Sequence, residues 1–230
     1  MHSNLLIYRS LPAKYLIALC LITFGCKGSS GENNNNALAY NALKSWYLNN
    51  GSNNGNGSHQ APFNSFKQAM QALRPGDTLF IMPGNYKLTE AIVPQHSGTA
   101  HRRITIKGFD PANRPVLMPT QKRAILIQGL SHYRFQDIEI NGNFVRDQLV
   151  IMRNGNANIE FVNCKIGRSS ADGFAISESD NVLFDNCEIY YCVNFVNNRR
   201  KDAHGIMYRS GSKLVVNNCN IHHVTGDGIQ

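Results

Sequence analysis

A six-residue pattern that recurs along the second half of the chain constrains the fold more than any other feature. Each copy begins with an apolar residue and has Asp or Asn third, Ile or Cys fourth and Ile sixth: residues 135–140, 161–166, 184–189 and 216–221. The fourth positions, at residues 138, 164, 187 and 219, lie 26, 23 and 32 residues apart. A period of about twenty to thirty residues that tolerates insertions is typical of a solenoid.

The segments between the copies are short alternating strands separated by polar turns, and no helical pattern lies between them. This favours one coil of a parallel β-helix per repeat over a leucine-rich repeat, which has a denser leucine frame. The composition, 42% hydrophobic and 17% charged, excludes a multi-pass membrane protein, a collagen and a wholly disordered chain. The sequence therefore predicts an all-β domain over residues 46–230.

Stacked coils would align two columns of side chains. The third position of the pattern should form a bend, where asparagine tolerates a left-handed backbone and its amide can bond to the next coil: Asn163, Asn186 and Asn218. The fourth position should fill the core with small thiols: Cys164, Cys187 and Cys219. Disulfides between coils are the open alternative in an exported protein. Cys192 is predicted to lie in a loop.

A short helix is predicted before the first strands. Apolar residues follow helical spacing at Phe66, Ala69, Met70 and Leu73. Asn64 or Ser65 can cap the start of this helix, and Pro75-Gly76 ends it. A strand over residues 79–82 and a turn over 83–85 follow.

The stretch APFNSFKQAMQALRPGDTLFIMPGNY, residues 61–86, resembles the N-terminal cap of right-handed parallel β-helix proteins of the pectin-lyase-like kind. These include polysaccharide lyases of the chondroitinase-B, alginate-lyase and pectate-lyase types, and residues 97–117 are similar to their first coils. The resemblance covers about residues 46–230. It implies a right-handed parallel β-helix, a solenoid, with a short N-terminal capping helix. It also implies cleavage of uronate-containing polysaccharide by β-elimination, often with bound calcium.

The N-terminus is typical of an export signal. Two basic residues and no acid precede an apolar run over residues 15–25, which is too short to span a bilayer but suits a signal-peptide core. Gly25-Cys26 and a polar stretch follow, so that residues 1–26 resemble a bacterial lipoprotein signal peptide. The resemblance implies lipidation at Cys26 and a flexible tether over residues 27–45. The alternative is secretion with Cys26 incidental. We expect an exported protein, lipid-anchored at the bacterial cell surface or in the periplasm, or secreted.

The net charge of +8 falls to +6 without residues 1–26, which hold two of the 23 basic residues and none of the 15 acidic ones. Outside the cell, a basic protein suits an acidic polysaccharide better than nucleic acid. Charge that serves only solubility is the alternative. We therefore expect an acidic polysaccharide and, through the lipid anchor, a membrane as partners of a monomer, and no nucleic acid.

A column of polar residues is predicted where one strand of each coil begins: Asp147, Asp172, His204 and Asp227. The alignment turns Leu149, Ile151, Phe174, Ile176, Ile206, Tyr208 and Ile229 inward. Stacked carboxylates repel one another and need a compensating charge. One interpretation is a site for calcium or sugar built from the three aspartates, with a protonated histidine between two of them. The other is that Asp-Gly and His-Gly are turn residues before a strand. No other cofactor is expected.

One connection in this region is longer than its counterparts. From the strand-end isoleucine to the column residue the chain takes 6 residues in one coil (166 to 172), 15 in the next (189 to 204) and 6 again (221 to 227). Inserted loops on a rigid solenoid commonly carry binding sites. Tyr190 and Tyr191 are predicted to stack on sugar rings, and Arg199 and Arg200 to bind carboxylates. A solvated loop tip is the alternative.

The lyase resemblance implies candidate roles for residues in and after this loop. Lys201 or His204 is the candidate base, and Arg200 or Arg209 is the candidate to neutralise the uronate. Asp172 and Asp227 are the candidates to hold calcium. No family catalytic motif can be laid onto these positions residue by residue.

Three functions remain open at this point. The first is a polysaccharide lyase-like enzyme acting on acidic polysaccharide. The second is a non-catalytic surface glycan-binding or adhesin protein. The third is a polysaccharide epimerase, since Asp202-Ala203-His204 resembles an Asp-x-His element of β-helix mannuronan epimerases. Because the sequence stops inside a predicted strand, we also expect a fragment that is truncated at its C-terminus.

Overall fold

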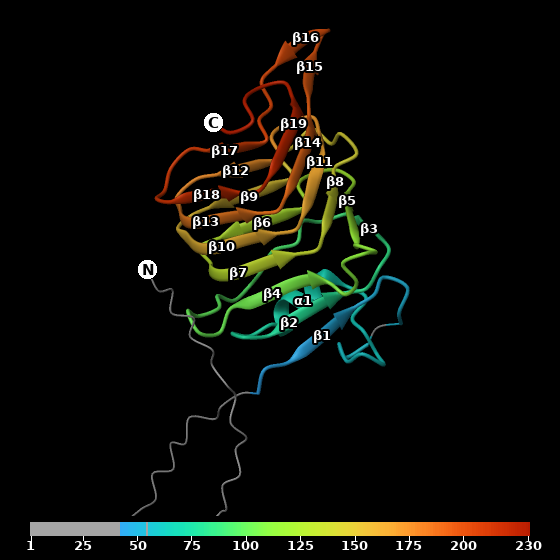
Figure 1. Cartoon of the computed structure of the whole chain (residues 1–230). Helices are drawn as coiled ribbons and strands as arrows, with labels where there is room; N and C mark the ends of the chain where they lie inside the picture. Colours follow the sequence, from blue (N-terminus) through green and yellow to red (C-terminus); the bar gives the residue numbers. More distant parts are fainter. Residues whose placement is uncertain (1–41, 54) are drawn as a thin grey trace, which may run out of the picture. The chain divides into compact units, whose positions relative to one another are not determined.

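The computed structural model describes residues 42–53 and 55–230. These residues form stacked coils made almost entirely of parallel β-strands (Figure 1). The predicted signal peptide, its lipidation site Cys26 and most of the predicted tether lie outside the described residues. Within the described part, no helix is long and apolar enough to cross a membrane.

Three sheets run along the solenoid. Sheet A has seven strands in the order β1 (Ser45–Leu48), β2 (Thr78–Ile81), β4 (Ile104–Gly108), β7 (Ser131–Gln136), β10 (Asn156–Val162), β13 (Ser179–Asp185) and β18 (Leu214–Asn217). Sheet B has six: β3 (Asn85–Leu88), β5 (Val116–Pro119), β8 (Glu139–Asn141), β11 (Lys165–Ser169), β14 (Glu188–Cys192) and β19 (Asn220–Val224). Sheet C has four: β6 (Ile125–Gln128), β9 (Val150–Arg153), β12 (Phe174–Ile176) and β17 (Ile206–Tyr208). The coils that begin with β4, β7, β10 and β13 each pass through sheets A, B and C in turn.

The register of sheet A confirms the repeat that the sequence predicts. Phe161 pairs with Phe135 on one side and with Phe184 on the other, and Phe184 pairs with Val216. These pairs have the spacings read from the six-residue pattern. Every coil therefore presents the first position of the pattern to the same interior line.

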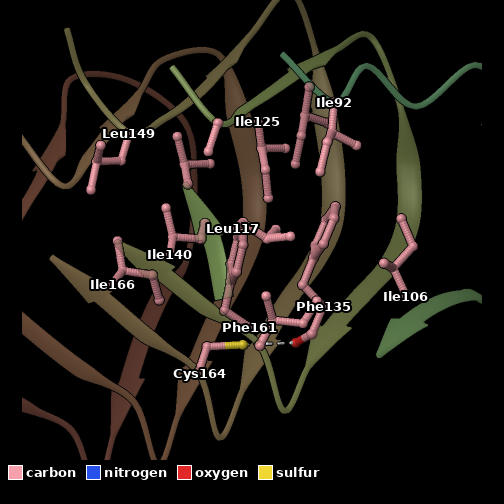
Figure 2. Close-up of a cluster of buried hydrophobic side chains, with 14 of the residues drawn as sticks. Ile92, Ile106, Leu117, Ile125, Phe135, Ile140, Leu149, Phe161, Cys164 and Ile166 are labelled. Atoms are coloured by element: carbon pink, nitrogen blue, oxygen red, sulfur yellow. Dashed lines mark hydrogen bonds between the residues drawn. The ribbon is translucent and has the colours of Figure 1, made fainter. Parts of the chain in front are cut away.

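The interior line is a stack of aromatic rings. The ring of Phe161 lies parallel to the rings of Phe135 and Phe184, with centroid distances of 5.0 and 5.3 Å. Phe174 of sheet C meets Phe161 edge-on at 4.9 Å. Figure 2 shows two of these rings among isoleucine and leucine side chains from all three sheets. Aromatic pairs in these geometries stabilise a core beyond the area that they bury.

The bend between sheets A and B confirms the predicted asparagine column. Asn163, Asn186 and Asn218 have φ angles of 51°, 52° and 49°, and their side-chain amides bond from coil to coil at 3.1 and 3.3 Å. Asp137, which the pattern also carries in third place, begins the column: it has a φ of 55° and accepts a hydrogen bond from Asn163 at 2.6 Å.

The cysteine column also lies where the sequence predicts it. Cys164 and Cys187 are buried, Cys219 is half-buried, and all three are free thiols. The prediction for Cys192 is wrong: it ends strand β14, pairs with Ser169 in the register of sheet B and is fully buried. The cause is a left-handed residue just before it, with a φ of 50°, which shifts the alternation of the strand.

The predicted capping helix is present as α1 (Phe66–Ala72), which buries Ala69 and Met70. Its N-cap, Ser65, is extended and makes no side-chain capping bond. Asp77 ties this cap to the first strand. Its buried carboxylate accepts hydrogen bonds from the Lys44 and Arg74 backbone N–H groups, both at 3.0 Å, and from the Trp46 indole at 2.9 Å.

One prediction of register is wrong in sheet C. Phe174 pairs with Val150, not with Leu149, so Val150 and Met152 are buried while Ile151 is only partly so. Leu149 is buried as well, and its carbonyl accepts the N–H groups of two successive residues, 124 and 125, at 2.9 and 3.2 Å. Such a two-to-one pairing accommodates an extra residue as a β-bulge does. Consequently Asp147 is not aligned with Asp172.

Candidate functional site

The strands of sheet C begin beside a row of three polar residues. The register of β12 and β17 aligns Asp172 with His204, and the bridge from Ile206 to Ile229 aligns His204 with Asp227. The His204 backbone N–H donates to Asp172 Oδ1 at 2.8 Å, and the Asp227 backbone N–H donates to His204 Nδ1 at 2.9 Å. The histidine therefore bridges three successive coils.

The protonated histidine that the sequence analysis expected is not the state that this geometry favours. A ring nitrogen that accepts a backbone N–H carries no proton, so His204 is the neutral tautomer with its proton on Nε2. The Asp172 carboxylate binds the backbone of His204, not its ring. The row is a set of hydrogen bonds between successive coils, made by residues that lie just before the sheet C positions.

The His204 ring is also covered. Its residue is only 3% exposed, and a Cβ atom added to Gly226 would lie 2.5 Å from Nδ1. The glycine thus lets the next coil close over the imidazole. Lys201, the other candidate base, is exposed.

Asp147 does not join the row. Arg123 holds its Oδ2 atom through three groups: Nε at 3.0 Å, Nη2 at 2.9 Å and the backbone N–H at 3.2 Å. Calcium binds six to eight oxygen ligands, chiefly carboxylates. The described residues contain no group of three or more His, Cys, Asp or Glu side chains placed to hold one metal ion. The three predicted aspartates therefore do not fit a shared calcium ion, and calcium dependence stays a prediction.

The long connection forms a β-hairpin rather than an irregular loop. Strands β15 (Asn194–Val196) and β16 (Arg199–Lys201) pair antiparallel and project from the solenoid (Figure 1). Asn197 and Asn198 connect them with φ angles of 51° and 58°, which is a two-residue turn of type I′. We call residues 194–201 the hairpin.

Thr225 anchors the hairpin to the next coil. The Asn194 N–H donates to the Thr225 hydroxyl at 3.0 Å, and Arg200 Nε donates to the Thr225 carbonyl at 2.7 Å. Thr225 precedes Asp227 by two residues, so the hairpin base adjoins the row. Beyond this anchor, Phe195 is 62% exposed, and the three basic residues Arg199–Lys201 are exposed.

The remaining predicted site residues lie elsewhere. Arg209 follows β17, and its Nε lies 3.0 Å from Met207 Sδ. It is five residues from His204, up to about 16 Å along an extended strand. Tyr190 and Tyr191 belong to strand β14 of sheet B, not to the hairpin. Burial, with the charge of Glu139, raises the pKa of Tyr190 to about 12.

Sequence reasoning missed several residues that surround the predicted ones: Arg123, Phe144, Arg168, His222, His223 and Thr225. Most of these belong to other coils than their partners, and contacts between coils depend on the register. The strand alignment could have found His222, because it pairs with Tyr190.

Three parallel sheets, an asparagine bend and an aromatic interior stack define a pectin-lyase-like parallel β-helix. Residues 46–230 match the family described as the Pel9A-like, right handed beta helix region, and the chain belongs to this family. The predicted right-handed parallel β-helix is thereby confirmed. No match was found among curated proteins.

Solved structures with the same fold differ widely in sequence. Pectate lyase Pel9A is 19% identical with a TM-score of 0.64, over 77% of this chain and 48% of its own. A GH136 lacto-N-biosidase from Eubacterium ramulus is 14% identical with a TM-score of 0.51, over 73% and 36%. An alginate lyase from Paenibacillus sp. str. FPU-7 is 18% identical with a TM-score of 0.49, over 67% and 62%. The chain spans about half the length of pectate lyase Pel9A, and the likenesses to this lyase and to the lacto-N-biosidase show the fold alone.

Proposed function

We propose that this protein is an exported, carbohydrate-active β-helix protein that cleaves uronate-containing polysaccharide by β-elimination. The observation that carries the proposal is the basic hairpin. Its residues Arg199, Arg200 and Lys201 are exposed, and Arg200 ties the hairpin to Thr225, two residues before Asp227 of the row. The likeness of the fold to a pectate lyase gives the reaction class that we test.

In a β-elimination, a base takes the proton from the carbon next to the uronate carboxylate. The electron pair of that C–H bond forms a carbon–carbon double bond, and the glycosidic oxygen leaves and takes up a proton. Cations near the carboxylate stabilise the negative charge that develops before the bond breaks. This chemistry needs one accessible base and at least one accessible cation.

The exposed hairpin residues suit these two roles. Lys201 is the proposed base, since its side chain is exposed and can reach a polymer, whereas the ring of His204 is buried. Arg199 and Arg200 are the proposed ligands of the uronate carboxylate, because guanidinium groups bind carboxylates in a fixed geometry. His204 is a positioning residue that holds the coil bearing Asp227 in place. The role of Arg209 in neutralising the uronate stays a prediction.

The variant Lys201→Met tests these roles. We expect it to abolish the rise in ultraviolet absorbance of unsaturated uronate on polygalacturonate, alginate or dermatan sulfate, while binding to that polymer persists. The matched control is Lys67→Met on α1, an exposed lysine remote from the hairpin in sequence, which should cleave like the wild type. Unchanged turnover in Lys201→Met would overturn the assignment. Parallel reactions with calcium and with a chelator test the calcium prediction.

A glycan-binding protein without catalysis is the second candidate. The exposed aromatic side chains of Phe195 and Tyr191 favour it, since such rings bind sugars without any reaction. Retention on a polymer in affinity electrophoresis, with no rise in absorbance, would identify this function. Uptake of deuterium from solvent without shortening of the polymer would instead identify an epimerase.

The proposal also includes export and a lipid anchor. It predicts that the wild-type protein, expressed with its N-terminus in a bacterium, partitions into detergent and incorporates labelled fatty acid. Cys26→Ala should lose both properties. A wild-type protein without label would leave secretion as the alternative to anchoring.

A further inference from the structure

A second column of left-handed residues follows the outer face of sheet B. Within this sheet Gly167 pairs with Tyr190, and Ser169 pairs with Cys192, so that one residue of each coil is left between the paired positions. These residues have φ angles of 60° at Arg168, 50° at Tyr191 and 54° at His223.

The preceding coil supplies a fourth member two residues past Gly142, which the register of sheet B sets level with Arg168, and directly after the left-handed Asn143, whose φ is 47°. Phe144 has a φ of 56°, and its N–H donates to the carbonyl of Arg168 at 2.6 Å. We call Phe144, Arg168, Tyr191 and His223 the planar column. The strands that carry or adjoin it, β8, β11, β14 and β19, lie side by side in Figure 1.

The residue types of the planar column are unusual for this backbone. A left-handed conformation costs a side chain other than Gly, Asn or Asp about 1–2 kcal/mol. The bend between sheets A and B meets this constraint with Asp and Asn alone, from Asp137 to Asn218. A third column, at the start of the sheet A strands, has Asn158 and Asn181 between His132 and Lys213. The three members of the planar column that share one register position, Arg168, Tyr191 and His223, include neither Asn nor Asp, so the fold does not explain their composition.

All four side chains of the planar column are exposed. Phe144 is 40% and Tyr191 43% exposed. The guanidinium group of Arg168 lies over the Phe144 ring at 5.5 Å, and the rings of Tyr191 and His223 are 4.6 Å apart. Strained backbone with exposed, chemically specific side chains is characteristic of functional surfaces.

Further planar side chains lie beside the planar column. The Tyr190 ring lies over Gly167, where an added Cβ atom would come within 2.7 Å of Cδ1. Tyr190 also stacks on His222, with an interplanar angle of 22°. Phe144, Arg168 and the two tyrosines line an open hollow of about 280 Å³. The result is a shallow surface of ring faces with one exposed cation.

We propose that the planar column is a second, non-catalytic subsite for an acidic oligosaccharide, which lies along the solenoid axis on sheet B. The faces of Phe144 and Tyr191 would stack on sugar rings, and Arg168 would bind a uronate carboxylate. Coils repeat at about 4.8 Å, so successive members of the column can follow successive positions along an extended sugar chain. The acidic class of the sugar rests on the proposed function. The subsite differs from the hairpin site in sheet and in residues.

The test uses the backbone strain itself. Arg168→Asn and Tyr191→Asn replace costly left-handed residues with one that tolerates this conformation. We expect the double variant to unfold at an unchanged or higher denaturant concentration and to bind polygalacturonate at least tenfold more weakly in affinity electrophoresis. Alginate and dermatan sulfate serve as parallel probes. The control is Lys213→Asn, an exposed left-handed residue on another sheet, which should keep full binding.

The outcomes separate this inference from the proposed function. A double variant that binds every retained polymer like the wild type would overturn the planar column as a subsite, whatever the turnover. A wild-type protein that binds a polymer through the planar column but never cleaves it would uphold the subsite and overturn the lyase. Loss of binding together with loss of stability would mean that the column serves folding, which also contradicts the inference.

Discussion

At the scale of single residues, this fold depends on side chains that tolerate a left-handed backbone where the chain turns from one sheet to the next. Asn186 has a φ of 52° and bonds to asparagines in both neighbouring coils, at 3.1 and 3.3 Å. Asn186 therefore contributes to stability in two ways, by tolerating the left-handed backbone and by its amide hydrogen bonds to the neighbouring coils, which we call the ladder. Substitutions can separate the two contributions.

Asn186→Ala should lower the free energy of unfolding by about 2–3 kcal/mol, because alanine tolerates the left-handed conformation poorly and cannot make the hydrogen bonds of the ladder. Glycine adopts the left-handed conformation without cost, so Asn186→Gly loses only the amide hydrogen bonds. It should lower the free energy of unfolding by roughly 1 kcal/mol. Urea unfolding of both variants measures the difference. Equal losses would mean that the ladder alone accounts for the choice of asparagine.

Cys192 gives the protein a dependence on alkaline pH. Burial, together with the charge of Asp172, raises the pKa of this thiol from 9.0 to about 12. The folded state therefore holds the thiol proton more tightly than the unfolded state. The stability that this provides is complete below pH 9 and is lost as the pH rises from 9 towards 12.

The free energy of unfolding should fall more steeply above pH 9 in the wild type than in Cys192→Ala, by up to about 1.4 kcal/mol per pH unit. Urea unfolding at pH 8, 9 and 10 measures both slopes. The alanine variant is less stable at every pH because it leaves a cavity, so only the slope is compared. Parallel slopes would contradict the burial of this thiol.

At the scale of elements, the hairpin shows what sequence patterns reveal and what they miss. The spacing of the repeats predicted an insertion of the correct place and size, but not its structure. Asn197-Asn198 is a turn signal of type I′, yet the flanking residues lack the alternation that marks a hairpin. Tyr190 and Tyr191 were assigned to the same loop, because the sequence does not show where strand β14 ends.

Replacing residues 195–200 with a short Gly-Ser link should abolish turnover and change the free energy of unfolding by less than about 1 kcal/mol. Phe195 and Val196 are exposed, and the main anchor of the hairpin is Thr225. Exposed substitutions away from packed features have small effects on stability. Turnover and urea unfolding of the same preparation decide the matter, and a variant with intact turnover would remove the hairpin from the site.

At the scale of the whole molecule, the repeat was sufficient to predict the solenoid, its bends and its interior columns. The register of one coil could not be predicted, because Leu149 and Val150 are both apolar and both buried, and alternation alone does not choose between them. The same slip moved Asp147 into the predicted row. Its true partner, Arg123, lies in the preceding coil and carries no motif.

The alignment of Asp172, His204 and Asp227 was predicted correctly, since each is followed by a glycine and an apolar residue that pairs with the next coil. The hydrogen bonds of the row could not be predicted. The sequence pattern does not show whether the aspartate carboxylate accepts from the backbone N–H of the histidine or from its ring. The planar column was missed for a related reason: left-handed positions are recognised in sequences by Asn and Gly, and this column has neither at its four positions.

The central proposal is that this β-helix cleaves uronate chains by elimination. Mass spectrometry of the products formed from polygalacturonate, alginate and dermatan sulfate tests this reaction most directly. We expect, on one polymer, oligosaccharides that lack the elements of water compared with hydrolysis products and that carry an unsaturated terminal uronate. Products with the mass of hydrolysis, or polymers left intact by a wild-type protein that binds them, would contradict it.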